Sequence, residues 1–209
     1  MADRMAMATA ERSDFADFLE TLHPEEWQAP TLCEGWNVRQ VVAHVISYDT
    51  AAPLELAANF ARAGFRPARV NDLQVRALAD WTPEQLIDFL RTHLRPRGLT
   101  AGFGGGIGLS DCLIHHQDIR RALGRHRDIP SDRVREALSV ALRAPVLPAR
   151  RNANGLRMCA TDFAWTLGDG PEVTGTGEAL LLALAGRPAA LEHLDGPGLD
   201  TLRHRLRSL

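Results

Sequence analysis

Three polar residues near the middle of the chain have types and a spacing that suit metal binding. Asp111 and His115 are four residues apart, and Asp118 follows within the next helical turn, so an α-helix would carry all three on one face. His44, in an earlier predicted helix, supplies a second imidazole. Two imidazoles and a carboxylate around one open position form a ligand set that catalytic zinc uses. The alternative is an ordinary capping or hydrogen-bonded Asp–His pair without a metal ion.

Neighbouring polar residues are expected to have other roles. Asp118 could accept the second ring N–H of a ligand histidine, or it could pair with Arg120 or Arg121. His116 lies about 140° around the helix from the first ligand, so we expect a partly exposed side chain outside the ligand set. Cys33 lies in the loop that leads into the His44 helix and could approach the site from there, but we expect it to be a buried structural thiol.

The helix that carries His44 has clear local signals. Asn37 and Gln40 have the spacing of a capping box, as do Thr82 and Gln85 at the start of a later helix. The expected buried stripe of the His44 helix is Val38, Val41, Val42 and Val45. Further helices are predicted over residues 11–23, 53–63, 109–123 and 131–143.

The pattern changes after Pro145. Three short β-rich segments, LRMCATD, FAWTLGD and PEVTGT, predict a small antiparallel sheet, and residues 178–185 predict one more helix. We therefore expect a mainly α protein with two domains. Residues 1–145 would form a metal-binding helical bundle, and residues 146–209 a small α+β domain.

The composition excludes several classes of function. The chain has 209 residues, of which 45 % are hydrophobic, and 24 basic against 26 acidic side chains give a net charge of −2, so no nucleic acid or anionic membrane is expected as a partner. All basic side chains are Arg, which excludes a Schiff-base or P-loop lysine. Three cysteines without a CxxC pair, and no signal or membrane segment, predict a cytoplasmic protein.

Three stretches of the sequence resemble successive motifs of one family. LCEGWNVRQVVAHV, DCLIHHQDIRRALG and ATDFAWTLGDGPEVTGTGEALLLALAGR are similar to motifs of the mycothiol-dependent maleylpyruvate isomerase family, which belongs to the DinB-like superfamily. The resemblance runs from about Phe15 to Leu202. It implies a DinB-like four-helix bundle in which His44, Asp111 and His115 bind a metal ion, with a small C-terminal α+β appendage.

The resemblance also implies a chemistry. A divalent ion, with Zn²⁺ expected, would bind mycothiol or another low-molecular-weight thiol and lower the pKa of that thiol. Addition of the thiolate to a small electrophile and its later expulsion would isomerise a double bond, whereas addition alone would be an S-transferase reaction. Asp111 departs from the family, which more often has Glu at this position, so metal occupancy is open.

Arg187 is the candidate catalytic residue outside the metal site. It recurs in the resemblance and could hold a carboxylate of the substrate or thiol. The alternative is an arginine that interacts with a helix C-terminus. Two other functions stay open: a DinB-like metal-dependent hydrolase, and a non-catalytic small-molecule-binding or stress-response module. We expect a small-molecule substrate, and a homodimer is left open.

Overall fold

The computed structural model describes residues 3–207, which form two compact units that divide between His126 and Arg127. Helix α7 (Ser131–Ala141) packs against α9 (Gly177–Leu184) and therefore belongs to the second unit. The division lies one helix before the domain boundary predicted after residue 145. Each unit is described by itself.

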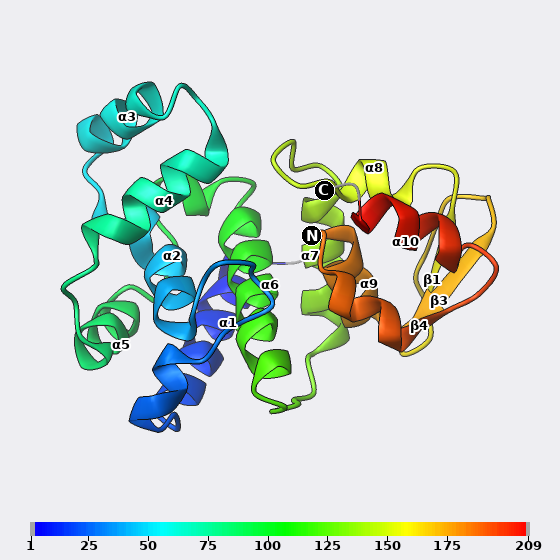
Figure 1. The fold of residues 1–209 in the computed structure, drawn as a ribbon, viewed down its shortest axis with the longest axis horizontal. Coiled ribbons are helices and arrows are strands. Elements are labelled where there is room, and N and C mark those ends of the chain that lie inside the picture. Colours follow the sequence, from blue (N-terminus) through cyan, green and yellow to red (C-terminus); the bar gives the residue numbers. More distant parts are fainter. Residues whose placement is uncertain (1–2, 208–209) are drawn as a thin grey trace. The chain divides into compact units, whose positions relative to one another are not determined.

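The first unit is built around four helices that contact one another in a ring. Helices α1 and α2 each pack against both α5 and α6, while α4 packs on α2 and α3 packs on α4 (Figure 1). The elements are α1 (Arg4–Leu19), the 3-10 helix η1 (Pro24–Gln28), α2 (Val38–Thr50), α3 (Pro53–Arg62), α4 (Pro67–Ala77), α5 (Pro83–Thr92), the 3-10 helix η2 (Gly98–Ala101) and α6 (Gly106–Ala122). Helix α4 is not among the predicted helices.

Both predicted capping boxes are present. The Asn37 side chain accepts from the backbone N–H of Gln40 at 2.9 Å, and the Gln40 side chain accepts from the backbone N–H of Asn37 at 2.9 Å. Thr82 and Gln85 make the same pair of contacts at 3.3 and 2.8 Å. These bonds satisfy backbone donors that have no partner within the helix, which is why α2 and α5 start where the sequence predicts.

Two helices start earlier than predicted. Helix α1 begins at Arg4, not residue 11, because the Asp3 side chain accepts from the backbone N–H of Ala6 at 3.0 Å. Helix α6 begins at Gly106, not residue 109, directly after Gly105 with a φ of +91°. A Cβ at Gly105 would lie 2.8 Å from Met5 Cα, so glycine lets α1 and α6 approach closely at this point.

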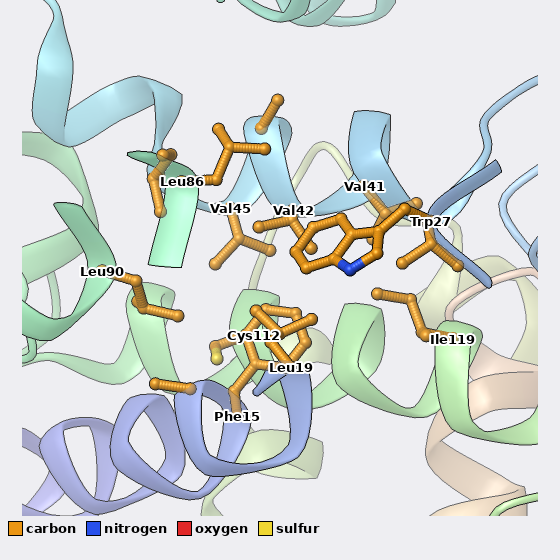
Figure 2. Close-up of a cluster of buried hydrophobic side chains, with 14 of the residues drawn as sticks. Phe15, Leu19, Trp27, Val41, Val42, Val45, Leu86, Leu90, Cys112 and Ile119 are labelled. Atoms are coloured by element: carbon orange, nitrogen blue, oxygen red, sulfur yellow. The ribbon is translucent and has the colours of Figure 1, made fainter. Parts of the chain in front are cut away.

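The core of the first unit fixes α2 in place. Val38, Val41 and Val42 are fully buried and Val45 is 1 % exposed, so the predicted valine stripe is confirmed. Figure 2 shows Val41, Val42 and Val45 in the same cluster as Phe15 of α1 and Ile119 of α6. Because the stripe determines the rotation of α2 about its axis, it also fixes the direction in which His44 projects.

The second unit combines helices with a four-stranded sheet. Its elements are α7, α8 (Ala149–Ala153), β1 (Arg157–Ala160), β2 (Thr166–Leu167), β3 (Glu172–Gly175), α9, the 3-10 helix η3 (Pro188–His193), β4 (Leu194–Asp195) and α10 (Leu199–Arg207). The strand order is β2-β1-β3-β4. The predicted helix over 178–185 corresponds to α9.

The prediction of a purely antiparallel sheet is wrong, because β1 and β3 are parallel. Strand β2 occupies one edge of β1 in an antiparallel pair, so β3 pairs with the other edge after a second reversal of the chain. Gly168 and Gly170 permit this return: a Cβ would lie 2.1 Å from the Leu156 carbonyl oxygen at the first and 2.0 Å from that of Gly155 at the second.

Among the described residues, no helix has the length and apolar character needed to cross a bilayer.

Candidate metal centre

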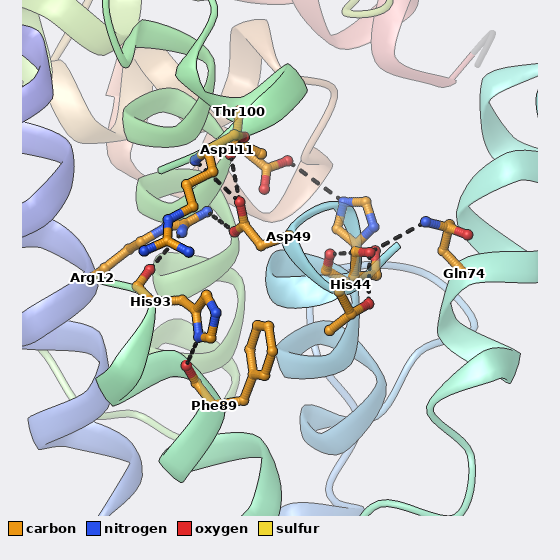
Figure 3. A network of polar contacts seen from close by, with 11 residues as sticks. Arg12, His44, Asp49, Gln74, Phe89, His93, Thr100 and Asp111 are labelled. Atoms are coloured by element: carbon orange, nitrogen blue, oxygen red, sulfur yellow. Dashed lines mark hydrogen bonds and ion pairs between the residues drawn. The ribbon is translucent and has the colours of Figure 1, made fainter. Parts of the chain in front are cut away.

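Helices α2 and α6 bring the three predicted metal ligands together. His44 Nε2 lies 3.5 Å from Asp111 Oδ1, and His115 Nε2 lies 3.7 Å from the same oxygen. The two imidazole rings are nearly perpendicular, with centroids 4.7 Å apart. Figure 3 shows His44 and Asp111 facing each other across the gap between their helices.

The donor set and its spacing fit a divalent ion. One ligand atom from each of the three residues lies within 4.8 Å of the others. Donors about 2.1 Å from a tetrahedral zinc ion are about 3.4 Å from one another, close to the distances between each imidazole nitrogen and Asp111 Oδ1. The side chains of His44 and His115 are 5 % and 9 % exposed, but that of Asp111 is 29 % exposed. The carboxylate side of the site is therefore accessible to a small molecule.

The surroundings of Asp111 favour its charged form. Burial alone would raise the pKa of the carboxyl group, but His44 lowers it by charge and by hydrogen bonding, and the charges of His115 and Arg12 lower it further. The net effect is a pKa below the ordinary value for Asp. A carboxylate ligand must be deprotonated, so this environment suits metal binding.

Asp118 contacts the far side of one predicted ligand. Its Oδ2 lies 3.0 Å from His115 Nδ1, and the Asp118 side chain is fully buried. A proton on Nδ1 would then point at the carboxylate, which leaves Nε2 as the nitrogen directed at Asp111. The geometry matches the predicted contact with a ligand histidine, while its effect on metal binding stays a prediction.

Two aromatic side chains pack against His44. The ring of Trp36 lies 5.0 Å from the His44 ring, and Tyr48 meets it edge-on at 6.1 Å. The Tyr48 hydroxyl donates to Asn71 Oδ1 at 2.6 Å. Burial, and secondarily the charge of Asp111, raise the pKa of Tyr48 to about 12, so the phenol stays protonated. The position of Tyr48 one turn after His44 is the sequence signal for its place here.

His116 is fully buried, which contradicts the expectation of a partly exposed side chain. Its Nδ1 lies 2.9 Å from Glu11 Oε1, and Arg120 Nε donates to its Nε2 at 2.8 Å. The ring also packs on Phe15 and Phe18. The face of α6 that looked exposed in a helical projection is covered by α1, which supplies Glu11 from far away in the sequence.

An ion pair that the sequence analysis did not identify lies close to the candidate site. Arg12 Nη2 is 2.7 Å from Asp49 Oδ2, and both side chains are 1 % exposed. Arg12 also donates to the His93 carbonyl oxygen at 2.9 Å, and Asp49 accepts from the Thr100 hydroxyl at 3.0 Å (Figure 3). No spacing rule joins these residues, because they come from α1, α2, η2 and the end of α5.

Two further candidates have different outcomes. Cys33 is partly exposed, and its Sγ forms a group of potential ligands with His115 and Asp118, which corrects the expectation of a buried thiol. Arg187 lies in the second unit, where its Nη1 donates to the Ala185 carbonyl oxygen at 2.9 Å. Its catalytic role stays a prediction.

Two solved structures share the fold of the chain. They are the mycothiol-dependent maleylpyruvate isomerase and a histidine-to-alanine mutant of it, and each aligns with a TM-score of 0.57 and 14 % sequence identity over 93 % of this chain and 91 % of the other. The predicted DinB-like helical bundle with a small C-terminal α+β part is thereby confirmed.

At the level of sequence, no curated protein shows significant similarity to the chain. Residues 8–97 match the family model of the mycothiol maleylpyruvate isomerase N-terminal domain. This segment includes His44 and the motif that precedes it, as the resemblance drawn from the sequence predicts. The match to this domain family covers less than half of the 209-residue chain.

Proposed function

We propose that the protein is a thiol-dependent isomerase that acts on a small electrophile such as maleylpyruvate. Its cofactor would be mycothiol or a similar low-molecular-weight thiol. Its metal would be a divalent ion, and we expect zinc. The domain match and the names of the two structural neighbours support this reaction class. The observation that carries the proposal is the convergence of His44 Nε2, His115 Nε2 and Asp111 Oδ1 in a partly open site.

The residues of the chain have distinct roles in this proposal. His44, Asp111 and His115 would hold the ion, which when bound lowers the pKa of a coordinating thiol so that thiolate is present near neutral pH. Asp118 orients the His115 ring through Nδ1. Because Asp111 is the most exposed of the three ligands, thiol and substrate would enter from its side.

The metal part of the proposal is tested by elemental analysis of the purified, untagged full chain. We expect about one zinc ion per chain, lost in His44→Ala and His115→Ala. His126→Ala is the matched control, because this histidine belongs to neither candidate ligand group. Absence of metal after reconstitution with zinc, or equal loss in the control, would overturn the assignment of the ligands.

The reaction is tested by following maleylpyruvate with and without added mycothiol. We expect isomerisation that needs both the thiol and the metal, and that is absent in His44→Ala. Product mass then separates two outcomes: an isomer with the mass of the substrate indicates isomerase activity, and a thiol adduct indicates S-transferase activity. Conversion that proceeds equally well without any thiol would contradict the proposed cofactor.

A further inference from the structure

The loop before α2 holds Cys33 against α6. The backbone N–H of Leu32 donates to the Asp118 carbonyl oxygen at 3.2 Å, which ties the loop to α6. The Cys33 N–H donates to Thr31 Oγ1 at 3.1 Å, and the Thr31 hydroxyl donates to the Trp36 carbonyl oxygen at 2.9 Å. The position of the thiol is therefore set by a hydrogen-bonded turn.

This turn gives the protein a second group of potential metal ligands. The Sγ of Cys33, a ring nitrogen of His115 and a carboxylate oxygen of Asp118 lie within 4.8 Å of one another. His115 Nδ1 and Asp118 Oδ2 are 3.0 Å apart, whereas His115 Nε2 is directed at Asp111. The two ligand groups thus share His115, whose Nδ1 faces Asp118 and whose Nε2 faces Asp111.

We propose that Cys33, His115 and Asp118 form a separate binding site for a thiophilic divalent ion, such as Cd²⁺. The donor set of sulfur, nitrogen and oxygen differs from the nitrogen and oxygen set of His44, Asp111 and His115, and thiolate ligands favour soft ions. The assignment rests on the convergence of three side chains from two parts of the chain: Cys33 from the loop before α2, and His115 and Asp118 from α6.

The shared histidine makes the two sites compete. A neutral imidazole offers one nitrogen lone pair, because its other nitrogen carries the proton. As a neutral ligand, His115 therefore serves one ligand group at a time. A soft ion held by Cys33 would take His115 from the His44 group, so thiophilic ions would displace the ion bound there.

The test is a cadmium titration of the reduced, metal-free full chain, followed by the ultraviolet charge-transfer band of cadmium thiolates. We expect a saturable band in the wild type that is lost in Cys33→Ser and Cys33→Ala. The band should persist in His44→Ala, which removes a ligand of the first group only. It should also persist in Cys159→Ser, which tests the other partly exposed thiol.

Several results would overturn the proposal. These are a wild type without the band, a band that survives in both Cys33 variants, or a band that disappears in Cys159→Ser. Loss of the band in a folded His44→Ala protein would show one combined site and not two. Zinc content of Cys33→Ser is a separate readout, because this variant keeps every ligand of the His44 group, so failure here is distinguishable from failure of the proposed function.

Discussion

His116 Nδ1 lies 2.9 Å from Glu11 Oε1, with both side chains fully buried. Because Arg120 donates to the other ring nitrogen, the imidazole is neutral and its proton lies on Nδ1. The neighbouring His115 has different partners: its Nε2 faces Asp111, and its Nδ1 faces Asp118. Two consecutive histidines of α6 therefore serve different purposes: one joins α6 to α1, and the other faces the candidate metal site.

This division predicts opposite effects for two adjacent substitutions. His116→Ala should keep its zinc but lower the free energy of unfolding by about 3 kcal/mol, because it leaves the buried Glu11 carboxylate without this partner. His115→Ala should lose zinc, and because it also removes a partner of the buried Asp118 carboxylate, zinc content is the property that separates the two variants. Zinc content and urea unfolding in a chelator measure both. Loss of zinc in a folded His116→Ala protein would contradict the assignment.

The Arg12–Asp49 pair predicts a large stability effect at a single position. Arg12→Met should lower the free energy of unfolding by about 3–5 kcal/mol, because it leaves the Asp49 carboxylate buried without its cation. Arg91→Met is the matched control: Arg91 pairs with Asp17 and Glu20 at the surface, where such pairs contribute about 1 kcal/mol or less. Urea denaturation of both variants should separate them, and equal losses would contradict the role of burial.

The parts of the fold that follow from local sequence could be predicted. Asn37 with Gln40 and Thr82 with Gln85 mark helix starts by contacts within four residues, and the valine stripe of α2 follows from helical period alone. The early start of α6 could not be predicted in this way, because it depends on the approach of Met5 to Gly105. The parallel pairing of β1 with β3 likewise depends on topology.

The same distinction applies to the site. Asp111 and His115 are neighbours on one helix, and His44 lies at the edge of the valine stripe of a second predicted helix, so all three could be named from the sequence, as the family resemblance also implies. His116 could not be placed, because its burial depends on Glu11, 105 residues away. Cys33 reaches His115 and Asp118 only through the turn fixed by Thr31, which no spacing rule describes.

The contact between Asp118 and His115 predicts an effect on metal affinity without loss of a ligand. Asp118→Asn should weaken zinc binding by about 10–100-fold, because a carboxylate behind a ligand histidine fixes its tautomer and raises its basicity. Competition with a chromophoric chelator measures this change. Asp88→Asn, which alters an exposed carboxylate on α5, should bind zinc like the wild type. An unchanged affinity in Asp118→Asn would show that the contact is only structural.

The raised pKa of Tyr48 predicts a measurable pH dependence. Tyr48 is the single tyrosine of the chain, so phenolate absorption after a rapid pH jump reports on it alone. The folded protein should titrate near pH 12 and the unfolded chain near pH 10. Between these values the unfolded chain binds fewer protons, so the contribution of Tyr48 to stability is complete below pH 10 and is lost as pH rises toward 12.

Two variants separate the causes of this shift. Asp111→Asn removes the smaller cause, the nearby negative charge, so the pKa of Tyr48 should fall but stay above 10, because burial is the larger cause. Tyr48→Phe should show no phenolate transition at all. A folded wild type that titrates near pH 10 would mean that water reaches the phenol. In that case the side of His44 lined by Tyr48 would be open to solvent, and entry of thiol and substrate would not be confined to the Asp111 side.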